Sequence, residues 1–283
     1  MHRTVPIGGH ILSETAGMFG PITIQDLAGK RWFYNAGRLQ SAVFLSPTTS
    51  QMDSTRPPIK GPGPIGACTY TAGWLIAALS HPKGRGLMLG LGGAEGAISL
   101  LSNFPELTLD VIEIDNDLIE VVGRHYPLYR HYENLGRLSV FCACADTWLQ
   151  QTSNQYDFVI FDIDDGRAEI NPLLTNPRFL KNLFHSANEH WFNLITRLDH
   201  SNYSVALKTL AAAHWPHLFQ YNCQPHSMNM LVTNRPPRSA DASFKPFAQI
   251  SACPGSEEQA AVDHVRARFA HLCRTVQDAG AKP

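Results

Sequence analysis

Apolar and polar positions alternate in blocks through the middle of the chain. Four apolar runs predict strands at residues 86–91, 107–114, 137–142 and 156–163. A glycine-rich turn and a helical pattern follow the first run, and further helical patterns lie near residues 117–125 and 146–151. Strands that are apolar along their length and alternate with helices are typical of a parallel sheet covered on both faces. The pattern therefore predicts an α/β domain.

The amino-terminal part has a different pattern. Residues 22–45 contain three short strand-prone runs separated by glycine-containing turns, which predicts a small antiparallel β-meander. Residues 46–67 are rich in Ser, Thr, Pro and Gly, a composition typical of a linker or flap because it buries little surface. An apolar helix is predicted at residues 70–79. We therefore assign residues 1–67 to an amino-terminal β unit with its flap.

Beyond the fourth apolar run the pattern is mixed. We expect a long amphipathic helix at residues 179–198, a strand near 203–207, and a hairpin between residues 218–221 and 229–233. A capping-box signature at residues 256–259 begins a further amphipathic helix. These elements assign residues 68–235 to the α/β domain and residues 236–283 to a carboxyl-terminal extension.

Composition excludes two classes of protein. The chain has 283 residues, of which 23 are Lys or Arg, 24 are Asp or Glu, and 44% are apolar. A nucleic-acid binder needs a basic excess and a disordered chain has few apolar residues, so we expect neither. No apolar run approaches the ~20 residues that span a bilayer, and the start has no signal-peptide core. We expect a cytoplasmic protein without a membrane partner.

Cysteine and histidine spacing gives no indication of a metal site. The six cysteines include no Cys-x-x-Cys pair. Cys142 and Cys144 share one face of a predicted strand, where we expect two small buried side chains. His185 and His190 do not have the spacing of a zinc-binding helix. We expect no bound metal.

The near-zero net charge hides an uneven distribution. Residues 95–169 contain 14 acidic and four basic residues, whereas the rest of the chain contains 10 acidic and 19 basic residues. A cleft whose charges have one sign attracts ligands of the other sign. If this segment builds the cleft, the cleft is suited to a cation.

A glycine-rich turn follows the first predicted parallel strand. Gly90, Gly92 and Gly93 stand where that strand turns into its helix, and glycine there lets the backbone approach a ligand closely. Glu113 ends the next strand about twenty residues later. A nucleotide-binding fold places a carboxylate at that position to accept hydrogen bonds from the ribose hydroxyls. The two features together predict a nucleoside site.

The charge at the helix start distinguishes between classes of nucleotide. A dinucleotide places its pyrophosphate at this helix N-terminus, but Glu95 stands there and repels phosphate. No Walker lysine follows the glycines. A cationic nucleoside without phosphate suits Glu95 better. S-adenosylmethionine and its decarboxylated form, each with a sulfonium, are therefore favoured over NAD, FAD or ATP.

Further acidic residues stand at the ends of the later strands. Asp146 follows the third strand, where it is suited to accept the adenine amino group, to cap the following helix, or to do both. Asp162, Asp164 and Asp165 end the fourth strand, at the sheet edge where open α/β sheets bind ligands. Acids this close repel one another unless solvent or a cation relieves the repulsion. A cationic ligand at this edge is favoured over a solvated acidic loop.

These residues together resemble the spermidine synthase family of polyamine aminopropyltransferases. The segment Gly37–Gln40 is similar to the family's glycine-x-x-glutamine element, and Gly92–Gly96 resembles its glycine-rich GGGDG turn. The segment Glu113–Asp115 resembles its ribose-binding strand end. Asp146 stands where a Gly-Asp pair contacts adenine, and Asp162–Asp165 matches the Asp-x-x-Asp motif whose first residue is the family's proposed base.

The resemblance covers about residues 22–235 and implies a Rossmann-like class I AdoMet-dependent transferase sheet with a small amino-terminal antiparallel β domain. It implies that Asp162 accepts a proton and that Asp165 orients or binds the cationic acceptor. Gln40 and Tyr70 would border the tail of the donor, and Asp164 would contribute to substrate binding. A homodimer is also expected, because it is usual in the family.

Three departures from the family pattern concern the acceptor and the adenine. Ala145 stands in place of the adenine-side glycine, and Gly166 in place of a proline. The segment from Tyr70 to Trp74 lacks the family's substrate-side acid. Diamine recognition needs acids at both ends of the acceptor, so adenosyl binding carries over better than putrescine as acceptor.

Three functions stay open at this point. The first is aminopropyl-type transfer from S-adenosylmethionine or its decarboxylated form to a small amine or other small nucleophile, with release of methylthioadenosine. Its intramolecular variant would give an azetidine amino acid. The second is methyl transfer to a small molecule on the same fold, and the third is nucleoside binding without catalysis. The acidic strand ends favour an enzyme.

Overall fold

Two sheets organise the computed structural model. It describes residues 8–45, 74–75, 77–78, 81–164, 171–195, 208–210, 215, 219–222 and 229–234. The described part of the 70–79 segment is helical, as predicted. The other predictions at residues 46–67, 203–207 and 256–276 lie outside the described residues.

The amino-terminal unit is an antiparallel sheet in the order β1-β2-β3-β4. Its strands are β1 (His10–Gly17), β2 (Gly20–Leu27), β3 (Lys30–Asn35) and β4 (Arg38–Phe44). The predicted meander is confirmed for β2 to β4. The sequence pattern does not predict β1, because this edge strand has few buried positions and its register shifts between Ile11 and Ser13.

The second sheet has the strand order β10-β11-β9-β8-β5-β6-β7. Its strands are β5 (Arg85–Leu89), β6 (Thr108–Glu113), β7 (Leu138–Cys142), β8 (Tyr156–Phe161), β9 (Ala187–Ile195), β10 (Phe219–Asn222) and β11 (Asn229–Thr233). The four predicted strands pair in parallel, which confirms the α/β assignment. Strands β10 and β11 form the predicted antiparallel hairpin and join β9.

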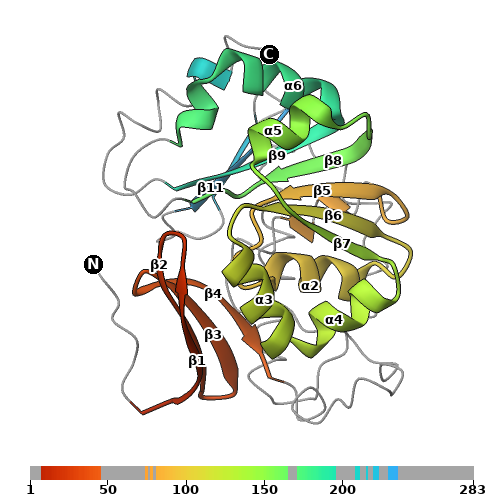
Figure 1. Cartoon of the computed structure of the whole chain (residues 1–283). Helices are drawn as coiled ribbons and strands as arrows, with labels where there is room; N and C mark the ends of the chain where they lie inside the picture. Colours follow the sequence, from red (N-terminus) through yellow and green to blue (C-terminus); the bar gives the residue numbers. More distant parts are fainter. Residues whose placement is uncertain are drawn as a thin grey trace.

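Helices cover both faces of the large sheet (Figure 1). Figure 1 shows α2 (Glu95–Asn103), α3 (Asn116–His125) and α4 (Pro127–Asn134) on one face, and α5 (Ala145–Gln151) and α6 (Pro177–Ser186) on the other. A short 3-10 helix, η1 (Pro172–Thr175), precedes α6. Leu87 and Met88 show why the strands are apolar throughout, since they pack into the two different cores. None of the described helices is long and apolar enough to cross a membrane.

The long helix predicted at residues 179–198 is wrong. Helix α6 begins after Asn176, whose side chain caps it, and ends at Ser186. The chain then enters β9, which pairs with β8 in parallel and with β11 in the opposite direction. Both faces of the sheet are covered at β9, where the consecutive residues Glu189 to Phe192 are all buried, so its apolar residues do not alternate. They therefore continued the helical pattern of α6 without a visible break.

Cys142 and Cys144 are also placed differently from the prediction. Both thiols are exposed, whereas the strand pattern predicted burial. Strand β7 is the last strand of the sheet, so its carboxyl end has a neighbour on one side only. Position on the sheet, rather than the residue type, decides their exposure.

The small sheet packs directly against the α/β domain. Ile24 and Phe33 belong to the same hydrophobic core as residues of α2, α3 and α4. Polar contacts join the two parts as well, because the backbone N–H of Ala42 donates to Glu95 Oε2 at 3.0 Å. The guanidinium of Arg31 donates to the carbonyl of His125. The amino-terminal sheet is therefore a fixed wall beside the edge where the parallel strands end.

Candidate functional site

A cavity of about 350 Å³ lies between the small sheet and the carboxyl ends of the parallel strands. Residues of β3 and β4 line one side, and the segments that follow β5, β6, β7 and β8 line the other. Four carboxylates face it: Glu95, Glu113, Asp162 and Asp164. Among the described residues that line the cavity there is no lysine or arginine. The cavity is therefore suited to a cationic ligand.

The glycines after β5 allow three segments to meet at the cavity. Gly90 has a φ of +98°, and a Cβ there would overlap the carbonyl oxygen of Asp162. A Cβ on Gly93 would overlap Ser41 Oγ and lie 2.6 Å from the Cβ of Phe33. The predicted role of these glycines was close approach to a ligand. In the structure, Gly90 and Gly93 also let β8 and the small sheet approach the turn.

Gly92, unlike Gly90 and Gly93, has open space beside its Cα. Its φ is +51°, and nothing lies within 4 Å of a Cβ built on it. It lines the cavity between Leu91 and Gly93. The open space at this position leaves room for a ligand, and the nucleoside-binding role of Gly92 stays a prediction.

Glu113 ends β6 and is held by three backbone donors. The N–H of Leu91 donates to its Oε2 at 3.0 Å, and the N–H groups of Ile114 and Asp115 donate to its Oε1 at 2.8 and 3.0 Å. Burial raises the pKa of Glu113 above its usual 4.5, against the lowering effect of these three bonds. A carboxylate has about four acceptor positions, so roughly one is left for a ligand.

The raised pKa of Glu113 predicts a pH dependence of stability. The folded chain binds this proton more tightly than the unfolded chain, so the free energy of unfolding should fall as the pH rises from about 4.5 through the raised pKa. Glu113→Gln removes the titrating group. Melting temperatures from pH 4 to 7 should therefore show the wild type losing stability relative to Glu113→Gln. Parallel curves would contradict the raised pKa.

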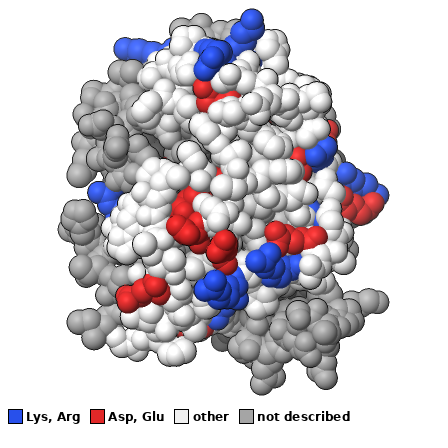
Figure 2. Space-filling model, viewed as in Figure 1, with Lys and Arg blue, Asp and Glu red and all other residues white. Residues whose placement is uncertain are grey.

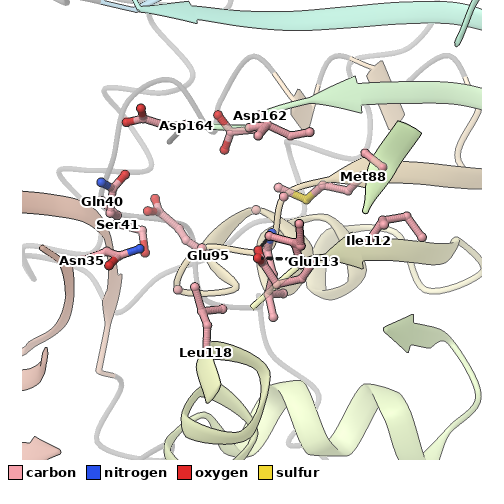
Figure 3. A pocket seen from close by; sticks show the side chains of 18 of the residues that line it. Asn35, Gln40, Ser41, Met88, Glu95, Ile112, Glu113, Leu118, Asp162 and Asp164 are labelled. Carbon is pink, nitrogen blue, oxygen red and sulfur yellow. Dashed lines mark hydrogen bonds between the residues drawn. The ribbon is translucent and has the colours of Figure 1, made fainter. Parts of the chain in front are cut away.

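Glu95 is the first residue of α2 and is buried, with 2% of its surface exposed. Its Oε2 accepts the backbone N–H of Ala42 in β4 at 3.0 Å. Figure 3 shows its carboxylate directed toward Gln40 and Ser41 of the small sheet. Glu95 therefore faces the cavity and joins its two walls, and the sequence predicts only the first of these roles.

Asp162 and Asp164 follow β8 and line the cavity (Figure 3). The N–H of Asp162 donates to the carbonyl of Leu89 at 2.9 Å, which continues the pairing of β8 with β5. In Figure 3 both carboxylates lie across the cavity from Gln40 and Glu95. The structure thus brings together acids from two strand ends and the glutamine of β4. Asp165 and Tyr70, the other predicted site residues, lie outside the described residues.

Asp146 lies in the first turn of α5 and is not among the residues that line the cavity. Its Oδ2 accepts from Arg178 Nη2 at 3.0 Å, while its buried Oδ1 has no hydrogen-bond partner among the described residues. The alternative role as helix cap is wrong, because Cys144 occupies the N-cap position. Its neighbours Ala143, Cys144 and Ala145 do line the cavity. The adenine-binding role stays a prediction.

The acidic segment is less concentrated at the cavity than its sequence indicates. Asp110 accepts from Arg85 Nη2 at 2.6 Å, and Glu133 accepts from Arg130 Nη1 at 2.7 Å, both away from the cavity. On the face shown in Figure 2, acidic and basic side chains lie beside one another in several places. The cavity owes its charge to four carboxylates rather than to the whole segment.

Asp115 is a structural residue with two roles, of which the sequence reveals only one. It is 1% exposed and caps α3, where its Oδ1 accepts from the N–H groups of Asp117 and Leu118. Its Oδ2 accepts the N–H of Met18 at 2.7 Å. The capping signal is local and visible in the sequence. The bond to a turn 97 residues away is a tertiary contact without a local signal.

Similar solved structures share this fold. No protein-family model matches the chain. The structure is similar to a spermidine synthase in complex with the transition state analogue AdoDATO, with a TM-score of 0.63 and 12% identity over 93% of this chain and 89% of that one. It is similar to a probable spermidine synthase from Corynebacterium glutamicum ATCC 13032, with a TM-score of 0.60 and 14% identity over 87% and 86% of the two chains.

A methyltransferase-like protein shows the same fold at lower similarity. Human methyltransferase-like protein 13 in complex with SAH has a TM-score of 0.51 and 18% identity over 72% of this chain and 93% of that one. The chain therefore has the fold shared by spermidine synthases and class I methyltransferases. This confirms the predicted fold class, a Rossmann-like sheet with a small amino-terminal antiparallel β domain.

Proposed function

We propose that this chain is a spermidine synthase-like transferase that uses S-adenosylmethionine or its decarboxylated form. The observation that carries the proposal is a cavity at the carboxyl edge of the parallel sheet, lined by four carboxylates and by no lysine or arginine among the described residues. A sulfonium nucleoside is cationic and has no phosphate, so it suits this charge. Phosphate-bearing nucleotides would meet repulsion from Glu95 at the start of α2.

Three residues offer contacts that a nucleoside needs. Glu113 has about one acceptor position left for a ribose hydroxyl after its three backbone bonds. In this proposal Asp146 accepts the adenine amino group, and the three residues that precede it, Ala143, Cys144 and Ala145, line the cavity. Gly92 lines the same cavity and leaves open space in its wall. The sulfonium side would then face Glu95, Asp162 and Asp164.

The proposed reaction is displacement at the propyl carbon next to sulfur. The acceptor nitrogen forms a bond to this carbon, the carbon–sulfur bond breaks with its electron pair going to sulfur, and neutral methylthioadenosine leaves. Asp162 accepts the proton that the acceptor ammonium must lose, and Asp165 orients that group. Gln40 and Tyr70 border the donor's tail, and Asp164 contributes to substrate binding. Most of the rate enhancement comes from holding the reacting atoms in line.

The acceptor in this proposal is a small amine or another small nucleophile. The intramolecular variant, in which the donor's own amine attacks and an azetidine amino acid forms, needs no acceptor site. The missing acid between Tyr70 and Trp74 favours that variant over a diamine. Methyl transfer is the second candidate, supported by the similarity to a methyltransferase whose complex contains SAH.

The products of turnover test this proposal. The protein is incubated with S-adenosylmethionine alone, with S-adenosylmethionine and diamines, and with the decarboxylated donor with and without diamines. Release of methylthioadenosine is expected, and its release without any acceptor would indicate cyclisation. S-adenosylhomocysteine as the product would contradict transfer at the propyl carbon and favour the methyltransferase. Tight nucleoside binding with no product would identify a non-catalytic binding protein.

Cys144 offers an independent test of where the nucleoside binds. Its thiol is exposed and lines the cavity, whereas Cys142 is exposed but does not line it. Saturating methylthioadenosine should slow iodoacetamide labelling of Cys144 at least fivefold and leave Cys142 unchanged, as measured by peptide mass spectrometry. The variants Cys142→Ser and Cys144→Ser separate the two signals. Equal labelling rates of Cys144 with and without nucleoside would exclude this part of the cavity as the binding site.

A further inference from the structure

Two large apolar side chains are exposed although they line the cavity. Phe19 is 43% exposed and Ile114 is 40% exposed, and both belong to the cavity wall. They come from distant parts of the chain, because Phe19 lies in the turn between β1 and β2 and Ile114 follows β6. Exposed apolar surface inside a cavity is a favourable place for an apolar part of a ligand.

A hydrogen bond joins the chain neighbours of these two residues. The N–H of Met18 donates to Asp115 Oδ2 at 2.7 Å. Phe19 follows Met18 in the chain and Ile114 precedes Asp115, so both lie next to the bonded pair. The first turn of the small sheet is thereby fastened to the residue beside the end of β6.

The hydrogen bond to Asp115 restricts the conformation of the turn between β1 and β2. Asp115 is 1% exposed and also accepts from the first turn of α3, so its carboxylate is fixed. The turn has two residues, because Gly17 pairs with Gly20 across the hairpin. A Cβ on Gly17 would lie 2.8 Å from Asp115 Oδ2, which shows how closely the strand approaches. Phe19 is therefore presented by a held turn rather than by a free loop.

We propose that Phe19 and Ile114 form an apolar clamp for the purine base of the bound nucleoside. The inference rests on the proposed function, in which the neighbouring Glu113 binds the ribose. Glu113, Ile114 and Phe19 line the same cavity, so in the proposal the base attached to a ribose at Glu113 covers the apolar surface of Ile114 and Phe19 that water otherwise contacts. An aromatic ring against a base contributes to affinity without reading its hydrogen-bonding edge. Phe19 is thus a nucleoside-binding residue supplied by the small sheet.

The test is calorimetric titration of methylthioadenosine into the full-length wild type and its variants. Phe19→Ala should raise the Kd about tenfold, which corresponds to about 1.4 kcal/mol. The Kd of Phe19→Tyr, which keeps the aromatic ring, should stay within threefold of the wild-type value. Ile11→Ala is the matched control, because Ile11 is 46% exposed in the same hairpin and does not line the cavity. It should change the Kd less than twofold. Methylthioribose, which lacks the base, should not distinguish the wild type from Phe19→Ala.

The outcomes separate the clamp from the proposed function. A wild type that binds no methylthioadenosine contradicts the proposed function. A wild type that binds, with a Phe19→Ala variant of equal affinity, contradicts the clamp alone. Loss of self-association in Phe19→Ala at unchanged Kd, measured by light scattering, would assign Phe19 to a subunit interface and overturn the clamp. If Phe19→Ala melts early, Phe19→Leu gives the same comparison with less loss of volume.

Discussion

Replacing Asp162 by Asn is expected to lower kcat by at least ~100-fold, because a positioned general base contributes a factor of roughly 10² to 10⁴. The amide keeps the shape of the side chain but accepts no proton from the acceptor ammonium. The Kd for methylthioadenosine should stay within threefold of the wild type. Steady-state kinetics and titration on the same preparation measure both quantities.

The structure makes Asp162→Asn an interpretable variant. The backbone of Asp162 is held by its hydrogen bond to Leu89 and by the close approach of Gly90, and neither contact involves the side chain that the substitution changes. Asp164→Asn is the matched control, because Asp164 lines the same cavity two residues later. It should raise KM for the acceptor more than it lowers kcat. Full activity in Asp162→Asn would show that another group accepts the proton.

Replacing Glu113 by Ala is expected to weaken nucleoside binding at least ~50-fold and to destabilise the fold. The substitution removes the acceptor of three backbone N–H groups, those of Leu91, Ile114 and Asp115. Leaving buried donors without a partner costs about 1 to 3 kcal/mol, so a loss of ~2 to 3 kcal/mol in the free energy of unfolding is expected. Titration and chemical denaturation measure the two effects.

A second glutamate serves as control for the Glu113→Ala variant. Glu120 lies on α3, is exposed, and accepts a hydrogen bond from the side chain of Asn116. Glu120→Ala should change neither the nucleoside Kd nor the stability by a measurable amount. A Glu113→Ala variant that folds and binds methylthioadenosine as tightly as the wild type would remove the ribose-binding role.

The parallel strands are predictable because burial on both faces requires continuous apolar runs. Strands β5 to β8 lie within or close to the predicted ranges for this reason. The same rule fails for β9, where a buried strand directly follows the apolar face of α6 and the two patterns merge. It fails for β1 for the opposite reason, since an edge strand needs little burial. The pattern of apolar residues therefore identifies a strand only where the packing around that strand produces a pattern different from that of the adjacent elements.

The residues of the site also fall into a part that the sequence predicts and a part that it does not. The turn at Gly90–Gly93 and the carboxylates at the strand ends are predictable, because a parallel sheet brings the ends of its strands to one edge. The wall from the small sheet is not, since Asn35, Ser41 and Phe19 reach the cavity only through tertiary packing. The charge pattern of the sequence predicts the negative sign of the cavity correctly but overestimates the number of acids there. Asp110 and Glu133, for example, form ion pairs with arginines away from the cavity.

In the proposed function the cavity selects a cationic nucleoside without phosphate. Calorimetric titration of one preparation with S-adenosylmethionine, its decarboxylated form, ATP and NAD measures this selectivity. We expect binding of at least one sulfonium nucleoside, with ATP and NAD at least ~100-fold weaker because Glu95, Glu113, Asp162 and Asp164 repel their phosphates. Binding of ATP or NAD as tight as that of both sulfonium nucleosides would contradict it.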